Sequence, residues 1–169
     1  MSEFKFSSLH ELDQNEALAH GFYLCVLHAD KIPPHIGCLI DGLFYSLKVN
    51  GKDEQLPVNQ LLKAILRKKV PTVFVQVDTP ESTRQVAEIY ERYQKIEVGE
   101  STCLSPLVQL FKCEDSVYKL SQLLEHLNHG GRIKKVFKVH LTDEFTAIAA
   151  YSLEEIEQRL VYLSDVKRR

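Results

Sequence analysis

A cysteine and a histidine are the residues whose types and surroundings could support catalysis. Cys103 lies in the segment Glu100-Ser-Thr-Cys-Leu-Ser-Pro-Leu-Val-Gln-Leu-Phe111, in which Ser101 and Thr102 are residue types that often begin helices. We therefore expect Cys103 at or beside the first turn of a helix, where free backbone N–H groups and the helix dipole lower the pKa of a thiol. Such a thiolate is a nucleophile when an imidazole is near. The alternative is a small, inert core residue.

The histidine is His35, in Pro33-Pro-His-Ile-Gly37. Two consecutive prolines make a rigid loop, so His35 should open a strand at the rim of a sheet, a suitable position for a general base. Gly37 would allow another backbone or a substrate to approach closely. The alternative is an ordinary surface histidine in a loop.

The elements that must position these residues begin with a predicted helix at 9–19, indicated by the capping-box pattern Ser8-Leu-His-Glu11. Apolar and aromatic runs then predict three strands, at 21–28, 35–40 and 43–49. Asp41-Gly42 is a strong hairpin signal between the second and third strands. Together they predict a three-stranded antiparallel meander.

The middle of the chain predicts alternating helices and strands. Pro57 suits the first turn of a helix at 58–68, and a strand follows at 70–77. Thr79 is the expected cap of a helix with Pro80 in its first turn, ending near Tyr93 and followed by an extended piece at 95–98.

The last third predicts a helix–hairpin–helix extension. Asp115 is the expected cap of a helix to Leu127, and Gly130-Gly131 ends it. A strand at 134–141 should pair with 144–151 in a hairpin, and the capping box Ser152-Leu-Glu-Glu155 should open a helix to Leu163. The predicted fold class is α+β: one domain over 1–169, with a core at 20–112 and an extension at 113–169 packed on it.

Composition narrows the function classes. The chain has 169 residues and a formal net charge of −2, which argues against nucleic-acid binding; the basic stretches 132–135 and 167–169 are best interpreted as solvated surface. The chain has no apolar run long enough for a membrane helix and no signal-peptide pattern at its start, so we expect a cytoplasmic protein. Four irregularly spaced cysteines and the absence of a phosphate-binding glycine loop predict no disulfide, metal or cofactor.

The order of these motifs resembles a known family. A His-x-Gly strand (His35-Ile-Gly37), a second strand (Gly42-Leu-Phe-Tyr-Ser-Leu47) and a later Thr-Cys at a helix start (Ser101-Thr-Cys-Leu-Ser105) look like the circularly permuted branch of the papain-like NlpC/P60 superfamily. The resemblance covers roughly residues 20–112.

The resemblance implies a cysteine hydrolase or acyltransferase that acts on an amide or ester in a small molecule or peptide. Cys103 would be the nucleophile and His35 the general base. The third polar residue would come from the strand after the histidine, where Ser46 has suitable chemistry; the usual His, Asn or Gln is absent there. Thr102 also stands where many members have Asn.

Two further hypotheses stay open. The protein could be an inactive binding module with the same cleft, or an interaction domain of another α+β fold in which Cys103 and His35 never meet. Among the remaining candidates, His28 is expected to be a partly buried histidine. The other three cysteines, Cys25, Cys38 and Cys113, are expected to be inert core residues.

Overall fold

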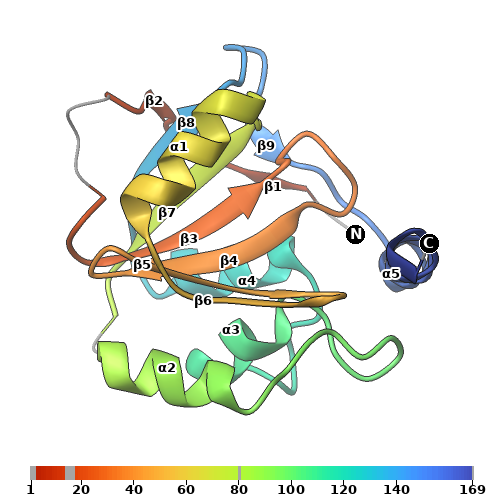
Figure 1. Cartoon of the computed structure of the whole chain (residues 1–169). Helices are drawn as coiled ribbons and strands as arrows, with labels where there is room; N and C mark the ends of the chain where they lie inside the picture. The colour runs from red at the N-terminus through yellow and green to blue at the C-terminus, as the bar shows by residue number, and fades with distance from the viewer. Residues whose placement is uncertain (1–2, 14–17, 80, 169) are drawn as a thin grey trace.

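A seven-stranded sheet forms the centre of the computed structural model, which describes residues 3–13, 18–79 and 81–168 (Figure 1). The strand order is β2-β8-β7-β3-β4-β5-β6, and every pairing is antiparallel except that of β2 with β8. The strands are β2 (His10–Glu11), β3 (Phe22–Leu27), β4 (His35–Ile40), β5 (Leu43–Lys48), β6 (Gly51–Pro57), β7 (Thr72–Val77) and β8 (Ile133–Val139). The α+β class and the mostly antiparallel sheet are thus confirmed.

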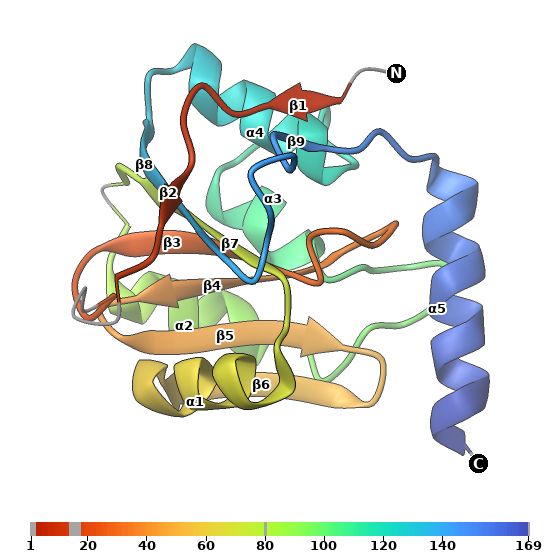
Figure 2. The ribbon, with the colours of Figure 1, turned by 90° about the horizontal axis from the view of Figure 1, so that it is seen from above.

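Helices cover both faces of this sheet. One face carries α1, and the opposite face carries α2, α3 and α4, while α5 stands beside the ends of the strands (Figures 1 and 2). The helices are α1 (Val58–Lys68), α2 (Thr83–Glu91), α3 (Ser105–Leu110), α4 (Leu120–His129) and α5 (Leu153–Arg168). No described helix has the length and apolar character needed to span a membrane.

The meander of β3, β4 and β5 forms as the sequence predicts. β3 pairs with β4 so that Leu27 lies opposite His35, and β4 pairs with β5 so that Gly37 lies opposite Ser46. Gly37 is required here, because a Cβ at this position would lie 2.5 Å from the Tyr45 carbonyl oxygen and 2.8 Å from the Phe44 ring. The close approach predicted for Gly37 is therefore made by the neighbouring strand.

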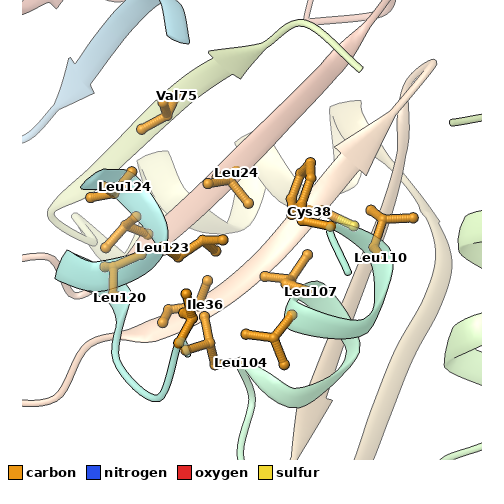
Figure 3. Packing of buried hydrophobic residues seen from close by; sticks show 14 of the residues in the cluster. Leu24, Ile36, Cys38, Val75, Leu104, Leu107, Leu110, Leu120, Leu123 and Leu124 are labelled. Atoms are coloured by element: carbon orange, nitrogen blue, oxygen red, sulfur yellow. The ribbon is translucent and has the colours of Figure 1, made fainter. Parts of the chain in front are cut away.

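Alternation along the strands divides the core into two layers. Ile36 and Cys38 of β4 point toward Leu104, Leu107 and the other apolar residues of the α3 and α4 layer (Figure 3). Leu39, one residue further, packs with Leu61 of α1 instead. Each such buried aliphatic side chain contributes about 1.5–3 kcal/mol, so β4 is fixed by both layers.

The N-terminal helix predicted at 9–19 is wrong for its described part. Residues 10–11 form β2, which pairs in parallel with β8, and β1 (Phe4–Lys5) pairs with β9 (Ala147–Ile148). Pairing with distant strands overrides the local capping pattern. Residues 14–17 lie outside the described part of the chain.

Two helix starts also differ from the prediction. α2 begins at Thr83, because the Ser82 hydroxyl accepts from the Gln85 amide while the Gln85 side chain accepts from the Ser82 amide; Thr79 is not its cap. α4 begins at Leu120, five residues beyond the expected cap Asp115. Residues 95–98 form no strand.

The predicted hairpin of 134–141 with 144–151 is wrong. β8 joins the central sheet beside β7, and residues 147–148 pair with β1. The last third is therefore built into the main sheet. Its final capping box is confirmed: the Ser152 hydroxyl accepts from the Glu155 amide, and the Glu155 carboxylate accepts from the Ser152 amide.

Candidate functional site

A cavity of about 440 Å³ lies between the ends of three neighbouring strands and α5. Its walls come from the end of β3, the loop to β4, the end of β5, the turn before α3, and one side of α5. The residues that line it include Leu27, His28, Lys31, His35, Ile36, Lys48, Cys103, Leu104, Ile156, Arg159, Leu160, Leu163 and Lys167. Both residues singled out in the sequence, Cys103 and His35, therefore line one cavity.

The two residues nevertheless belong to different faces of the sheet. His35 shares the face of Leu27, its cross-strand neighbour, and Leu27 packs with the α1 layer. Cys103 packs with the opposite layer, together with Ile36. The cavity thus wraps around the end of the sheet, and His35 and Cys103 reach it from opposite sides of β4.

Cys103 is partly buried, and its thiol is protonated at neutral pH. Burial raises the pKa of Cys103 to about 11, although the nearby backbone of Ile36 and its own backbone act in the lowering direction. The lowered pKa expected at a helix start is thus wrong. The physical reason is that α3 begins only at Ser105 and has six residues, so Cys103 lies in the preceding turn, outside the helix.

His35 is neutral at neutral pH. Burial lowers the pKa of His35 to about 4; Asp53 acts in the raising direction, and Lys48 adds to the lowering. Its Nε2 atom is buried and has no hydrogen-bond partner among the described residues. Consequently neither the thiol of Cys103 nor the hydroxyl of Ser46 is bonded to this nitrogen.

The Ser46 hydroxyl is hydrogen-bonded to Asp53 and not to His35. Its side chain is fully buried, and its hydroxyl donates to Oδ2 of Asp53 on β6 at 2.7 Å. Lys48 donates to the other oxygen of Asp53 at 3.1 Å. The structure therefore places Ser46 in a cross-strand polar group with Asp53 and Lys48, and does not join it to His35.

The basic lining of the cavity was missed in the sequence. Four cations, Lys31, Lys48, Arg159 and Lys167, and two imidazoles, those of His28 and His35, line it, with no aspartate or glutamate among the lining residues. They come from segments far apart in the chain, so no local motif reveals them. The amphipathic spacing of Ile156, Leu160 and Leu163 was the one available signal that α5 covers something apolar.

The other three cysteines, Cys25, Cys38 and Cys113, are buried, as expected. The expectation of a partly buried His28 is wrong, because this residue follows the end of β3 and is exposed where it lines the cavity. Across residues 3–13, 18–79 and 81–168, no cluster of three or more His, Cys, Asp or Glu side chains is arranged to hold a metal ion.

Comparison with known proteins does not indicate a function, so the function is inferred from the geometry of the cavity. A scan against protein-family models, a search of curated proteins and a search of solved structures each returned no match.

Proposed function

We propose that the protein is a binding module for an amphipathic anion, a ligand with an apolar chain and a carboxylate or phosphate head. The observation that carries the proposal is the composition of the cavity between the strand ends and α5: apolar walls, four cationic side chains and no acidic lining residue. The apolar chain would be held by burial and the head by charge.

The apolar part of the site is supplied from two directions. Ile36 and Leu104 contribute from the sheet side, and Ile156, Leu160 and Leu163 contribute from α5. Each CH₂ group of a ligand buried between them contributes about 0.8 kcal/mol. A chain of several carbons therefore supplies most of the affinity.

The charged part of the site is arranged for an anionic head. Lys48 is already paired with Asp53, and Lys167 donates to Asn50 at 3.1 Å. Lys31 has no ion-pair partner among the described residues. The guanidinium carbon of Arg159 lies 5.3 Å from the centroid of the Tyr162 ring, within the about 6 Å of a cation–π contact. Lys31 and Arg159 therefore have their donors free for a ligand.

Calorimetric titration with dodecanoate tests the proposal. We expect saturable binding that weakens about three- to tenfold in Arg159→Gln and again in Lys31→Gln, because each removes one charge from the mouth of the cavity. Dodecanol, which has the same chain without the charge, should bind more weakly than dodecanoate.

Lys63→Gln is the matched control, since Lys63 is an exposed lysine on α1, outside the cavity. Its affinity for dodecanoate should equal that of the wild type. Equal losses in Lys63→Gln and Arg159→Gln, or no saturable binding at all, would refute the proposal.

The same cavity supports a second candidate function, a thiol acyltransferase or hydrolase. What favours it is that Cys103 and His35 both line the cavity and that Nε2 of His35 is buried without a partner. In this proposal the Cys103 sulfur attacks an acyl carbonyl, and His35 carries the thiol proton to the leaving group. This proposal includes the permuted papain-like (NlpC/P60) fold type that the motif order resembles.

Acyl transfer from p-nitrophenyl dodecanoate tests this second candidate. One equivalent of p-nitrophenol and a dodecanoyl group on Cys103, seen by peptide mass spectrometry, should both disappear in Cys103→Ser and in His35→Ala. Hydrolysis that continues unchanged in Cys103→Ser would refute it.

A further inference from the structure

A second groove, of about 640 Å³, lies on the other flank of α5. Its lining residues come from the turn before α3, from α3 itself, from the connection between α3 and α4, and from the first turns of α5. Its apolar floor consists of Leu104, Val108, Val117, Ile156 and Leu160. Leu104, Ile156 and Leu160 also line the cavity described above, so the two sites share one apolar wall.

The rim of this groove has the opposite charge to the cavity. The four glutamates among its lining residues are Glu100, Glu114, Glu154 and Glu157, and no lysine, arginine or histidine lines it. All four are exposed, and none has an ion-pair partner among the described residues. Four carboxylates that lack a cationic partner around an apolar floor make this rim a patch of negative charge.

Large apolar side chains stay exposed at this rim. Tyr118 is 53% exposed and Leu153 is 54% exposed, and both line the groove. Exposed aromatic and aliphatic residues beside a concave apolar surface are typical of protein interfaces, where Tyr is enriched. A small ion would satisfy the carboxylates but would leave these two side chains in water.

We propose that this groove docks a basic, leucine-containing segment of a partner protein. Lysine or arginine side chains of the segment would pair with Glu100, Glu114, Glu154 and Glu157, and its apolar side chains would pack on the floor and against Tyr118 and Leu153. The occupant follows from charge complementarity, because an anionic or neutral segment would leave the four carboxylates unpaired.

Fluorescence anisotropy with two labelled peptides tests this inference. The basic probe is Gly-Lys-Leu-Arg-Leu-Lys-Gly, and its reference is Gly-Gln-Leu-Gln-Leu-Gln-Gly. We expect the basic probe to bind at least tenfold more tightly than the reference at low salt. The double variant Glu154→Gln/Glu157→Gln should reduce this preference three- to tenfold, and added salt should reduce it as well.

The matched control is Glu88→Gln/Glu144→Gln, which removes the same charge from exposed positions outside the groove. Glu155 stays unchanged because it caps α5. Thermal unfolding and dodecanoate binding of Glu154→Gln/Glu157→Gln should match those of the wild type if α5 remains in place. A loss of peptide binding can then be distinguished from a failure of the cavity proposal. Equal affinity for the two peptides, or equal losses in the two double variants, would overturn the inference. Self-association of the free protein that Glu154→Gln/Glu157→Gln abolishes would also overturn it, in favour of a second copy.

Discussion

Cys103 packs in the same apolar layer as Ile36, the residue that directly follows His35, and its thiol lies near the backbone of Ile36. Neighbouring side chains on a strand point to opposite faces of the sheet. Cys103 therefore lies beside the start of β4, next to the position of His35, but on the opposite face of the sheet. The cavity is continuous around the strand ends, so a ligand can contact both residues without the two being bonded to each other.

Cys103 should react slowly with alkylating reagents at neutral pH. Because burial raises its pKa to about 11, we expect iodoacetamide to alkylate Cys103 at pH 7.5 at least tenfold more slowly than a free cysteine, with the rate increasing steeply only near pH 10. Peptide mass spectrometry measures this rate for each thiol. Cys38, fully buried with a pKa of about 12, is the internal reference and should stay unmodified in the folded protein. Rapid alkylation below pH 8 that slows in His35→Ala would contradict this prediction.

Acid should destabilise the fold through His35. Its pKa is lowered from 6.5 in the unfolded chain to about 4 in the fold, so the unfolded chain binds the proton more tightly. The stabilisation is therefore fully present above pH 6.5 and is lost as the pH falls toward 4. We expect the free energy of unfolding to be about 2 kcal/mol lower at pH 4.5 than at pH 7.5 from this group. Urea titrations at both pH values measure it, and His35→Gln should remove that part of the difference. An unchanged pH dependence in His35→Gln would assign the effect to other groups.

Ser46→Ala separates a structural role from a positioning role. Its hydroxyl donates to Asp53, so removing it should lower the free energy of unfolding by about 1–2 kcal/mol, measured by denaturant titration. Dodecanoate affinity and the alkylation rate of Cys103 should not change, because Ser46 is not bonded to His35. A change in either of these values without a loss of stability would show that Ser46 positions the site instead.

The cap of α5 should matter for binding as well as for stability. Ser152→Ala removes the hydroxyl that accepts from Glu155, at a cost of about 1 kcal/mol to the helix. We expect dodecanoate affinity to fall, because α5 forms one wall of the cavity. Ser82→Ala is the matched control: it breaks the equivalent capping box of α2, whose residues do not line the cavity. If Ser152→Ala and Ser82→Ala change dodecanoate affinity equally, the prediction that α5 forms a wall of the binding site is contradicted.

Most of the central elements could be predicted because their signals are local. The apolar runs of β3, β4 and β5 and the Asp41-Gly42 turn specify the meander, and Pro57 marks the start of α1. β6 was missed, because Gly51–Pro57 is mostly polar and only partly buried, as suits an edge strand. It resembles a loop in sequence.

The failures all involve partners that are distant in the chain. The pattern Ser8-Leu-His-Glu11 satisfies a capping box, yet residues 10–11 pair with β8, more than a hundred residues away. A strand was predicted at 134–141 and forms at 133–139, but its neighbour is β7 instead of the following segment. The turn before α3 and His35 line one cavity, but Cys103 is not bonded to the His35 ring. The alternation of Ile36 and Gly37 along β4 could have predicted which face of the strand Cys103 contacts. No local pattern could have predicted that α5 covers the cavity.

The pairing of β7 with β8 has a consequence for how the chain is made. Until residue 139 has left the ribosome, the edge of β7 has only β3 beside it, and its buried residues, among them Val73 and Val75, lack one neighbour. A nascent chain that stops after α3 therefore presents an open, apolar strand edge, which is a site for aggregation. Synthesis of the last third closes that edge, so the C-terminal segment protects the solubility of the chain during its own translation.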